Sequence, residues 1–372
     1  MPFRVAVCLF ALVSCFISTA GAQSLAAQQA LDSLRSQYHL PALLAAVIEP
    51  GRIRYVYGGV RRNDRPDPVQ LTDYLHIGSN TKGVTSLLAG RLVEQGRLKW
   101  DSKLLDVVPS LRPSALPAYV NVTLGELLSH RAGIQPYNTG AEIKKLPVFS
   151  GTAAEKRRQF AAFVLQQPPQ LPGVDELYVY SNAGYALAAL MLERASHRTW
   201  EELVAKAFRR LKLHYLLGFP ARHDAQQPWG HWLAAGDSTW QPLGPTHFYH
   251  LQDFLAPAGD LAMPLPDFAR LVQLHLTGLL GQRNYLTPAT YQTLHFGKPA
   301  YAYGWGVLKL AGTGAPVSWH NGTAGTFFCH TILYPSQKVA FVVLANAGGD
   351  GAEQACTKLR QRLKKLYLQG TL

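Results

Sequence analysis

A serine and a lysine three residues apart, Ser79 and Lys82 in the run Ser-Asn-Thr-Lys, form the pair in this sequence best suited to chemistry. In a helix, residues at this spacing share one face, so the hydroxyl and the amine would lie side by side. A serine hydroxyl is a weak nucleophile at neutral pH, and a neighbouring amine activates it by taking its proton or by holding another group that does. The lysine can do so only where burial or nearby positive charge disfavours its charged form. The pair therefore predicts a nucleophile at Ser79.

Two further motifs follow in the chain and would complete such a site. Tyr180-Ser181-Asn182 supplies a phenol and an amide directly before a helical pattern that runs to about Ser196, and His320-Asn321-Gly322 lies in a strand-rich C-terminal region. One short motif is weak evidence, because a chain of this size contains on the order of one Ser-x-x-Lys by chance. The weight of the prediction comes from three motifs in a fixed order, each beside a predicted helix or strand.

Other short matches to the second and third motifs occur elsewhere in the chain. Tyr119-Val120-Asn121 repeats the tyrosine–asparagine spacing, while His76-Ile77-Gly78 and His295-Phe296-Gly297 repeat the histidine–glycine spacing. The first precedes a predicted helix cap, the second adjoins the serine itself, and the third precedes the strand region. We expect structural roles for all three.

Strand patterns occur at both ends of the chain. Apolar or β-branched runs at 42–48 and 53–60 flank Glu49-Pro50-Gly51-Arg52, which is typical of a hairpin. After about residue 295, the runs at 303–310, 326–333 and 339–345 are joined by turns that contain glycine or proline. The last amphipathic segment, 352–366, is suited to a helix packed on a sheet.

Helical patterns occupy the middle of the chain. Val84, Leu87, Leu88 and Leu92 have helical spacing and Gly96 provides a stop, so Ser79 should open this helix. Capping boxes at Thr123/Glu126, Thr152/Glu155 and Thr199/Glu202 predict further helices. We therefore predict an α/β fold of the α+β type, in which both chain ends form an antiparallel sheet flanked by helices, with an inserted all-helical lobe. Within a catalytic domain over 23–372, we assign 23–78 and 295–372 to the sheet lobe and 79–294 to the mainly helical lobe.

Residues 1–22 have the pattern of a secretory signal peptide. Arg4 precedes an apolar run from Val5 to Ile17, which is followed by Ala20-Gly21-Ala22. The run is shorter than the ~20 apolar residues that cross a bilayer, and no other segment is long and apolar enough. The run up to Cys15 resembles a lipoprotein signal, but apolar residues continue past it and favour cleavage near Ala22 over lipidation. We expect a secreted or periplasmic protein without a transmembrane segment in the mature chain.

Composition narrows the class of protein further. With 372 residues, 48% of them hydrophobic, the chain can bury a large core. The net charge of +13 suggests affinity for anionic partners, but the basic residues are scattered, which favours a solvated surface over a nucleic-acid site. Cys329 and Cys356 could pair in an oxidising compartment, although two buried free thiols are favoured. His247 and His250 lack a third ligand, and zinc patterns such as HxH and HExxH are absent, so we predict no metal and no cofactor.

In this order, the three motifs resemble those of the β-lactamase-like serine hydrolases, especially the branch that holds class C β-lactamases, D-Ala-D-Ala carboxypeptidases, D-aminopeptidases and related esterases. The resemblance spans most of the mature chain. It includes Leu127-Leu128-Ser129-His130-Arg131-Ala132-Gly133-Ile134, Trp200-Glu201-Glu202-Leu203, Pro257-Ala258-Gly259-Asp260-Leu261 and Tyr303-Gly304-Trp305-Gly306.

The resemblance implies that Ser79 attacks a carbonyl and carries the acyl group, while Lys82 and Tyr180 move the proton. Either Lys82 or Tyr180 could be the base. Asn182 would orient the lysine and bind substrate, and His320 would donate toward the substrate or the tyrosine oxygen. Gly322 belongs to the third motif, and the backbone amides of Ser79 and Thr323 would form the oxyanion hole.

The third motif also bears on the substrate. Many β-lactamases of the family have lysine where this chain has His320, so the resemblance favours a peptidase or esterase. The main hypothesis is a hydrolase of an amide or ester, either a D-amino-acid peptide or a small ester, with cell-wall peptides as one source. The alternatives are a class C-like β-lactamase or a non-catalytic homologue that binds penicillin or peptidoglycan peptides.

Overall fold

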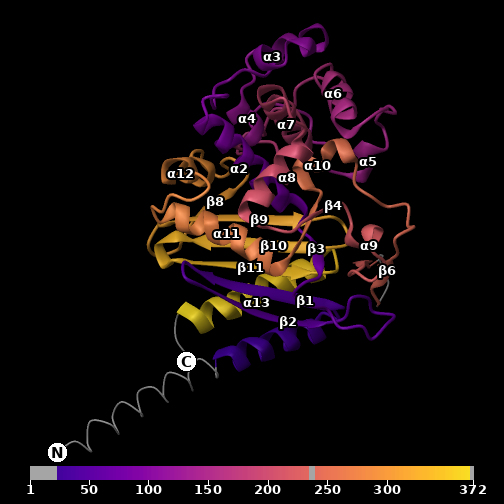
Figure 1. Ribbon diagram of the computed structural model, residues 1–372, viewed down its shortest axis with the longest axis vertical. Helices are drawn as coiled ribbons and strands as arrows, with labels where there is room; N and C mark the ends of the chain where they lie inside the picture. Colours follow the sequence, from indigo (N-terminus) through magenta and orange to yellow (C-terminus); the bar gives the residue numbers. More distant parts are fainter. Residues whose placement is uncertain (1–22, 234–238, 369–372) are drawn as a thin grey trace, which may run out of the picture.

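The computed structural model describes residues 23–233 and 239–368, and a six-stranded antiparallel sheet runs through it (Figure 1). Its strand order is β2-β1-β11-β10-β9-β8. The first two strands come from the N-terminal region, β1 (Ala42–Glu49) and β2 (Arg52–Gly59). The other four come from the C-terminal region: β8 (Gly306–Lys309), β9 (Pro316–Thr323), β10 (Phe328–Tyr334) and β11 (Val339–Ala345). The predicted fold class, with one sheet built by both chain ends, is confirmed.

Alternating residues of the strands pack into two separate hydrophobic cores, one on each face of the sheet. On β10, Phe328 and Ile332 pack under the terminal helices, which are 23–37 and α13 (Asp350–Leu368), while Cys329 and Leu333 face the helical side. This is the period-two pattern of a strand with both faces covered. It also places Cys329 and Cys356 in different cores, and both are buried free thiols.

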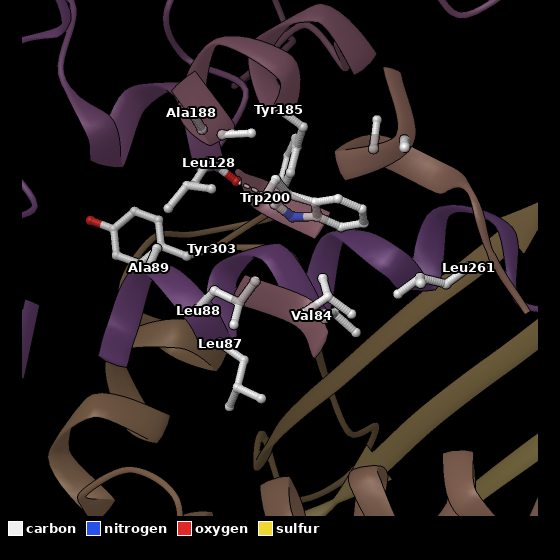
Figure 2. Close-up of a cluster of buried hydrophobic side chains, with 14 of the residues drawn as sticks. Val84, Leu87, Leu88, Ala89, Leu128, Tyr185, Ala188, Trp200, Leu261 and Tyr303 are labelled. Atoms are coloured by element: carbon white, nitrogen blue, oxygen red, sulfur yellow. Dashed lines mark hydrogen bonds between the residues drawn. The ribbon is translucent and has the colours of Figure 1, made fainter. Parts of the chain in front are cut away.

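The helical side is organised around α2 (Thr81–Glu94), which follows the short 3-10 turn η1 (Gly78–Asn80). Figure 2 shows Val84, Leu87 and Leu88 of α2 among aromatic side chains from other elements, including Tyr185 and Trp200. Trp200 Nε1 donates to Thr85 Oγ1 at 3.0 Å, which links α8 to α2 within this core. Because α2 is buried on nearly every side, it shows little amphipathic character.

The remaining elements surround α2 and the sheet. The longer helices are α6 (Ala153–Val164), α7 (Asn182–Ser196), α8 (Trp200–Leu211), α11 (Leu265–Leu279) and α12 (Pro288–Phe296). The short helices are α3 (Leu104–Val107), α4 (Leu124–Leu128), α5 (Gly140–Ile143), α9 (Pro220–His223) and α10 (Ala256–Gly259). A small sheet joins β3 (Tyr74–His76), β7 (Leu261–Pro264) and β4 (Leu216–Leu217), and β5 (Gly230–Trp232) pairs with β6 (Gln241–Leu243).

The local signals for the helix ends agree with the structure. All three predicted capping boxes are formed, and a fourth, Thr139 with Glu142, begins α5. The helix α2 ends at Glu94, shortly before Gly96. The φ of Gly96 is +69°, which is unfavourable for residues with a side chain. Over the described ranges, no helix combines the length and the apolar character needed to cross a membrane. The predicted signal peptide over 1–22 lies outside the described residues.

Candidate active site

Ser79 lies in the turn that leads into α2 and is more exposed to solvent than its neighbours in the sequence. From Leu75 to Gly90, Ser79 is the only residue that is not buried. The α-helix begins at Thr81, two residues after the predicted start, so Ser79 occupies the preceding 3-10 turn rather than the helix itself. The turn still directs the helix N-terminus toward the serine, where the positive end of the helix dipole stabilises developing negative charge.

Lys82 lies one turn further along and contacts three oxygen atoms. Its Nζ is 3.1 Å from Ser79 Oγ, 2.7 Å from Asn182 Oδ1 and 2.7 Å from the carbonyl oxygen of Ala258. The amide and carbonyl oxygens can only accept hydrogen bonds. A neutral amine has two N–H groups for these two acceptors and one lone pair left for the Ser79 hydroxyl. The arrangement therefore fits a lysine that accepts the serine proton.

Burial favours the neutral form of Lys82. The side chain is fully buried, and desolvation lowers the Lys82 pKa well below its ordinary value of 10.5. Over the described ranges, no carboxylate forms an ion pair with Lys82 that would oppose this shift. Its Nζ lies 4.7 Å from the centre of the Tyr180 ring.

Tyr180 precedes α7 and lies beside the same serine. Burial raises the Tyr180 pKa above its ordinary value of 10.0, and a hydrogen bond with Ser79 only partly opposes this. The phenol is therefore neutral at physiological pH and suited to donate a proton. The following residue, Ser181, caps α7 by accepting from the Gly184 amide at 3.0 Å, which fixes the position of Asn182 at the helix start.

The β9 backbone approaches the Ser79 turn at two glycines. A Cβ on Gly322 would lie 2.0 Å from the Ile77 carbonyl oxygen and 2.9 Å from the Ser79 nitrogen. A Cβ on Gly78, whose φ is +52°, would lie 2.5 Å from the Thr323 nitrogen. The absence of both side chains lets the Ser79 and Thr323 amides come together, as an oxyanion hole requires.

His320 lies on β9, and both of its ring nitrogens have partners. Nδ1 is 2.6 Å from the Asn321 carbonyl oxygen, to which it must donate, and Nε2 is 2.9 Å from the Tyr301 hydroxyl. Burial lowers the His320 pKa to about 3, so the ring is neutral and Nε2 accepts the Tyr301 proton. In this state, His320 has no free proton to donate to substrate or to Tyr180, which differs from the expected donor role.

A cavity of about 300 Å³ opens at Ser79. Its walls include Tyr137, Asn138, Asn182, Tyr249 and Thr323. No lysine, arginine, aspartate or glutamate side chain lines it within the described part of the chain. The cavity is thus suited to a substrate that is uncharged near the reacting carbonyl.

Comparisons with known proteins agree with this geometry. The family model described as Beta-lactamase matches residues 27–364. The chain belongs to the β-lactamase family.

Three members or structural neighbours of the β-lactamase family illustrate how distant the similarity is. Penicillin-binding protein 4 of Amycolatopsis lactamdurans is 24% identical over 341 residues, which cover 86% of this chain and 84% of that protein. The Beta-lactamase of Escherichia coli K12 is 24% identical over 353 residues, covering 85% and 86%. The octameric penicillin-binding protein homologue from Pyrococcus abyssi superposes with a TM-score of 0.72 at 20% identity, covering 92% of this chain and 76% of the other.

Several residues around the site were not predicted to belong to it, and His76 has the structural role expected for it. His76 accepts from the Gly78 amide through Nδ1 at 3.1 Å and contacts Asp260 Oδ1 through Nε2 at 3.0 Å, so this pair holds the turn before Ser79. The His130 ring lies 4.2 Å from the Tyr180 ring and 4.5 Å from the Tyr301 ring. His76, His130 and Asp260 all lie in conspicuous sequence runs, but Tyr301 had no local signal.

The competing short motifs have structural partners in this β-lactamase-family fold. Tyr119 is buried and its hydroxyl donates to the Gln167 carbonyl oxygen at 2.9 Å. His295 is buried between Ser318 Oγ at 2.6 Å and His275 at 2.8 Å. The aromatic stretch that begins at Trp229 reaches the cavity only at its end, through Tyr249 and His250.

Proposed function

We propose that this protein is a serine hydrolase that forms an acyl-enzyme on Ser79. The observation that carries the proposal is the set of three contacts at Lys82 Nζ, two of them to oxygens that can only accept and the third to the Ser79 hydroxyl, so that the neutral amine would keep its lone pair for this hydroxyl. A lysine that served only as a structural cation would need an acidic partner or water, whereas this one is buried against neutral acceptors. A non-catalytic penicillin or peptide binder would not require that arrangement.

The reaction follows from these positions. Lys82 takes the Ser79 proton while Oγ forms a bond to the carbonyl carbon of an ester or amide. The resulting oxyanion is stabilised by the Ser79 and Thr323 amides, and loss of one such donor typically costs about 3 kcal/mol. As the bond to the leaving oxygen or nitrogen breaks, the Tyr180 phenol protonates that atom and recovers a proton from Lys82. Water then releases the acid by the same steps in reverse.

The lining of the cavity favours some substrates over others. β-Lactam antibiotics and D-Ala-D-Ala peptides carry a free carboxylate near the scissile bond, and an isolated carboxylate is costly to bury without a cation. His320 is neutral and already bonded to Tyr301, and no lysine or arginine side chain lines the described part of the cavity. We therefore place small esters and amides of N-acylated D-amino acids, which are uncharged beside the reacting carbonyl, ahead of β-lactams. We also propose that the protein acts in the periplasm or outside the cell, on the basis of the sequence pattern in residues 1–22.

A substrate panel tests the proposal. Wild type and Ser79→Ala are assayed on a chromogenic ester, an amide of an N-acylated D-amino acid, a D-Ala-D-Ala peptide and a cephalosporin. We expect turnover of the first two by wild type and a loss of kcat/KM of roughly a thousandfold or more in the variant. Equal turnover by both proteins would refute the assignment of Ser79. Stable labelling by the cephalosporin without turnover of any substrate would favour the alternative, a non-catalytic homologue that binds penicillin.

A further inference from the structure

Basic side chains from two separate stretches of the chain, 91–97 and 198–210, meet in a second cleft at the opposite end of α2 from Ser79. The cleft has a volume of about 400 Å³ and lies between the last turns of α2 and helix α8. Since a helix rises about 1.5 Å per residue, the length of α2 separates it from the serine by about 20 Å. Five cationic residues line it: Arg91, Arg97, Arg198, Lys206 and Arg210.

These cations are almost free of acidic partners. Within the described ranges, no aspartate or glutamate lines the cleft, and of the five only Arg91 has an ion pair, at 3.5 Å to Glu94. Glu94 is also held by the Thr287 amide and the Thr290 hydroxyl, so it is shared among several donors. Like charges gathered without counter-charge repel one another and destabilise the fold, unless an anion occupies the space between them. The scattered positions of these residues in the sequence hide the cluster.

The floor of the cleft is apolar, which restricts the chemical class of ligand that would fit. Leu88, Leu92, Leu203 and Ala207 are buried beneath the charged rim, and the half-buried ring of Tyr285 forms one wall. The Arg91 guanidinium lies 5.7 Å from the centre of that ring. A simple inorganic anion would use the rim alone, whereas a ligand with a charged head and an apolar body would contact both parts.

We propose that this cleft binds a phosphate-bearing ligand whose apolar part packs against the leucine floor. Arginine presents a planar fork of donors that matches phosphate oxygens in pairs, and a phosphate monoester carries a charge of about −1.5 to −2 at neutral pH. Several cations around one cleft suit this multiple charge better than the single charge of a carboxylate. The ligand is either a soluble phosphate monoester or a phospholipid whose headgroup is itself a phosphate monoester, as in phosphatidic acid, because both present the same chemistry.

The test compares two charge-removing variants on the same helix. Lys206 and Arg210 are one turn apart on α8 and line the cleft, whereas Arg209 is exposed on α8 and does not. Binding of phenyl phosphate, inorganic phosphate and phenol is measured by titration calorimetry for wild type, Lys206→Gln/Arg210→Gln and Arg209→Gln. Co-sedimentation with vesicles that contain phosphatidic acid and with phosphatidylcholine vesicles forms the second arm. Thermal unfolding and ester hydrolysis at Ser79 verify that each variant is folded.

The expected result is binding of phenyl phosphate to wild type, tighter than that of either inorganic phosphate or phenol. The double variant should weaken it at least about tenfold, and Arg209→Gln less than about twofold, because hydrogen bonds to charged groups are the stronger ones. Binding of phosphatidic acid vesicles that is lost in the double variant identifies a lipid headgroup as the source, and phenyl phosphate binding alone identifies a soluble ester. Failure of every phosphate-bearing probe to bind wild type, or equal weakening by Arg209→Gln, would overturn the proposal.

Discussion

At the scale of single residues, the site depends on how burial shifts the pKa values of its lysine and its tyrosine. Lys82 is fully buried among neutral acceptors, which lowers its pKa, and Tyr180 is buried as well, which raises its pKa. Burial therefore favours the uncharged form of both groups. A neutral amine is a base and a neutral phenol is an acid, so the two candidate bases left open by the sequence receive different roles in our proposal.

The pH dependence of the reaction distinguishes the two bases. If neutral Lys82 is the base, kcat/KM should fall as the pH drops through the lysine pKa, which burial lowers well below its ordinary value of 10.5. Above that pKa, kcat/KM should stay level. If the Tyr180 phenolate were the base, activity would instead keep rising beyond pH ~10. Rates of hydrolysis of a nitrophenyl ester, measured from about pH 5 to pH 10.5, decide between these outcomes.

Replacement of the lysine by another cation gives a second check. Lys82→Arg keeps a positive, hydrogen-bonding side chain but introduces a group that does not lose its proton in proteins. We expect a loss of kcat/KM of about a hundredfold to ten-thousandfold, the usual contribution of general base catalysis. Activity near that of wild type in a folded Lys82→Arg protein would exclude the lysine as base.

Tyr180→Phe should separate the two halves of acyl transfer. Removal of the phenol takes away the proposed proton donor to the leaving group but leaves Ser79 and Lys82 in place. Hydrolysis of an amide, whose nitrogen must be protonated, should fall by about a hundredfold or more, whereas a nitrophenyl ester should lose less than about tenfold. Equal losses on matched amide and ester substrates would contradict this role.

The sequence brought out the residue types of the site better than their connections. Ser79, Lys82 and Asn182 are joined by hydrogen bonds in the structure, although Asn182 lies 100 residues from the lysine. The bond from Tyr301 to His320 was not predictable, because no local pattern marks Tyr301 and because the state of a histidine depends on its partners. The sequence therefore predicted a donor role for His320, because it did not reveal that Tyr301 is bonded to the Nε2 atom.

At the scale of elements, the close contact between β9 and the turn of Ser79 depends on glycine. Gly322→Ala would place a methyl group 2.0 Å from the Ile77 carbonyl oxygen, so β9 or the turn must move. We expect a destabilisation of about 1–3 kcal/mol, typical of overpacking, and a larger fractional loss of kcat than the stability change explains. Gly51→Ala, where a Cβ meets nothing within 4 Å, is the matched control and should be nearly neutral in both assays.

Element prediction was reliable where the signals are local. Capping boxes and the glycine stop after α2 are set by neighbours within a few residues, and they were found in advance. Strand β9 was not resolved as a separate strand, because Pro316–Thr323 mixes apolar residues with proline, asparagine and glycine. Its place between β8 and β10 is fixed by pairing partners, which a single sequence does not contain.

At the scale of the whole molecule, burial of neutral histidines makes the fold sensitive to acid. Desolvation lowers the pKa of His275, His320 and His330 to about 3 each and that of His231 to about 4. In the unfolded chain these rings bind protons near pH ~6.5. Between these limits the unfolded state therefore holds more protons than the folded state, and acid favours unfolding.

The free energy of unfolding should accordingly decrease as the pH falls below about 6.5, by up to about 1.4 kcal/mol per pH unit for each such histidine. Urea unfolding at three or four pH values between about 7.5 and 4.5 measures the slope. His330→Asn, which replaces a ring bonded to the Asn321 side chain, should reduce that slope. A stability that is flat across this range would contradict the neutral, buried state of the rings.

The most direct test of the account is the mass of the intact protein after brief exposure to an activated acylating ester. The account predicts a covalent adduct of one acyl group, found by peptide mapping on Ser79, and none in a folded Ser79→Ala protein. An adduct on another residue, or equal labelling of the variant, would contradict the proposal that this serine carries the acyl group.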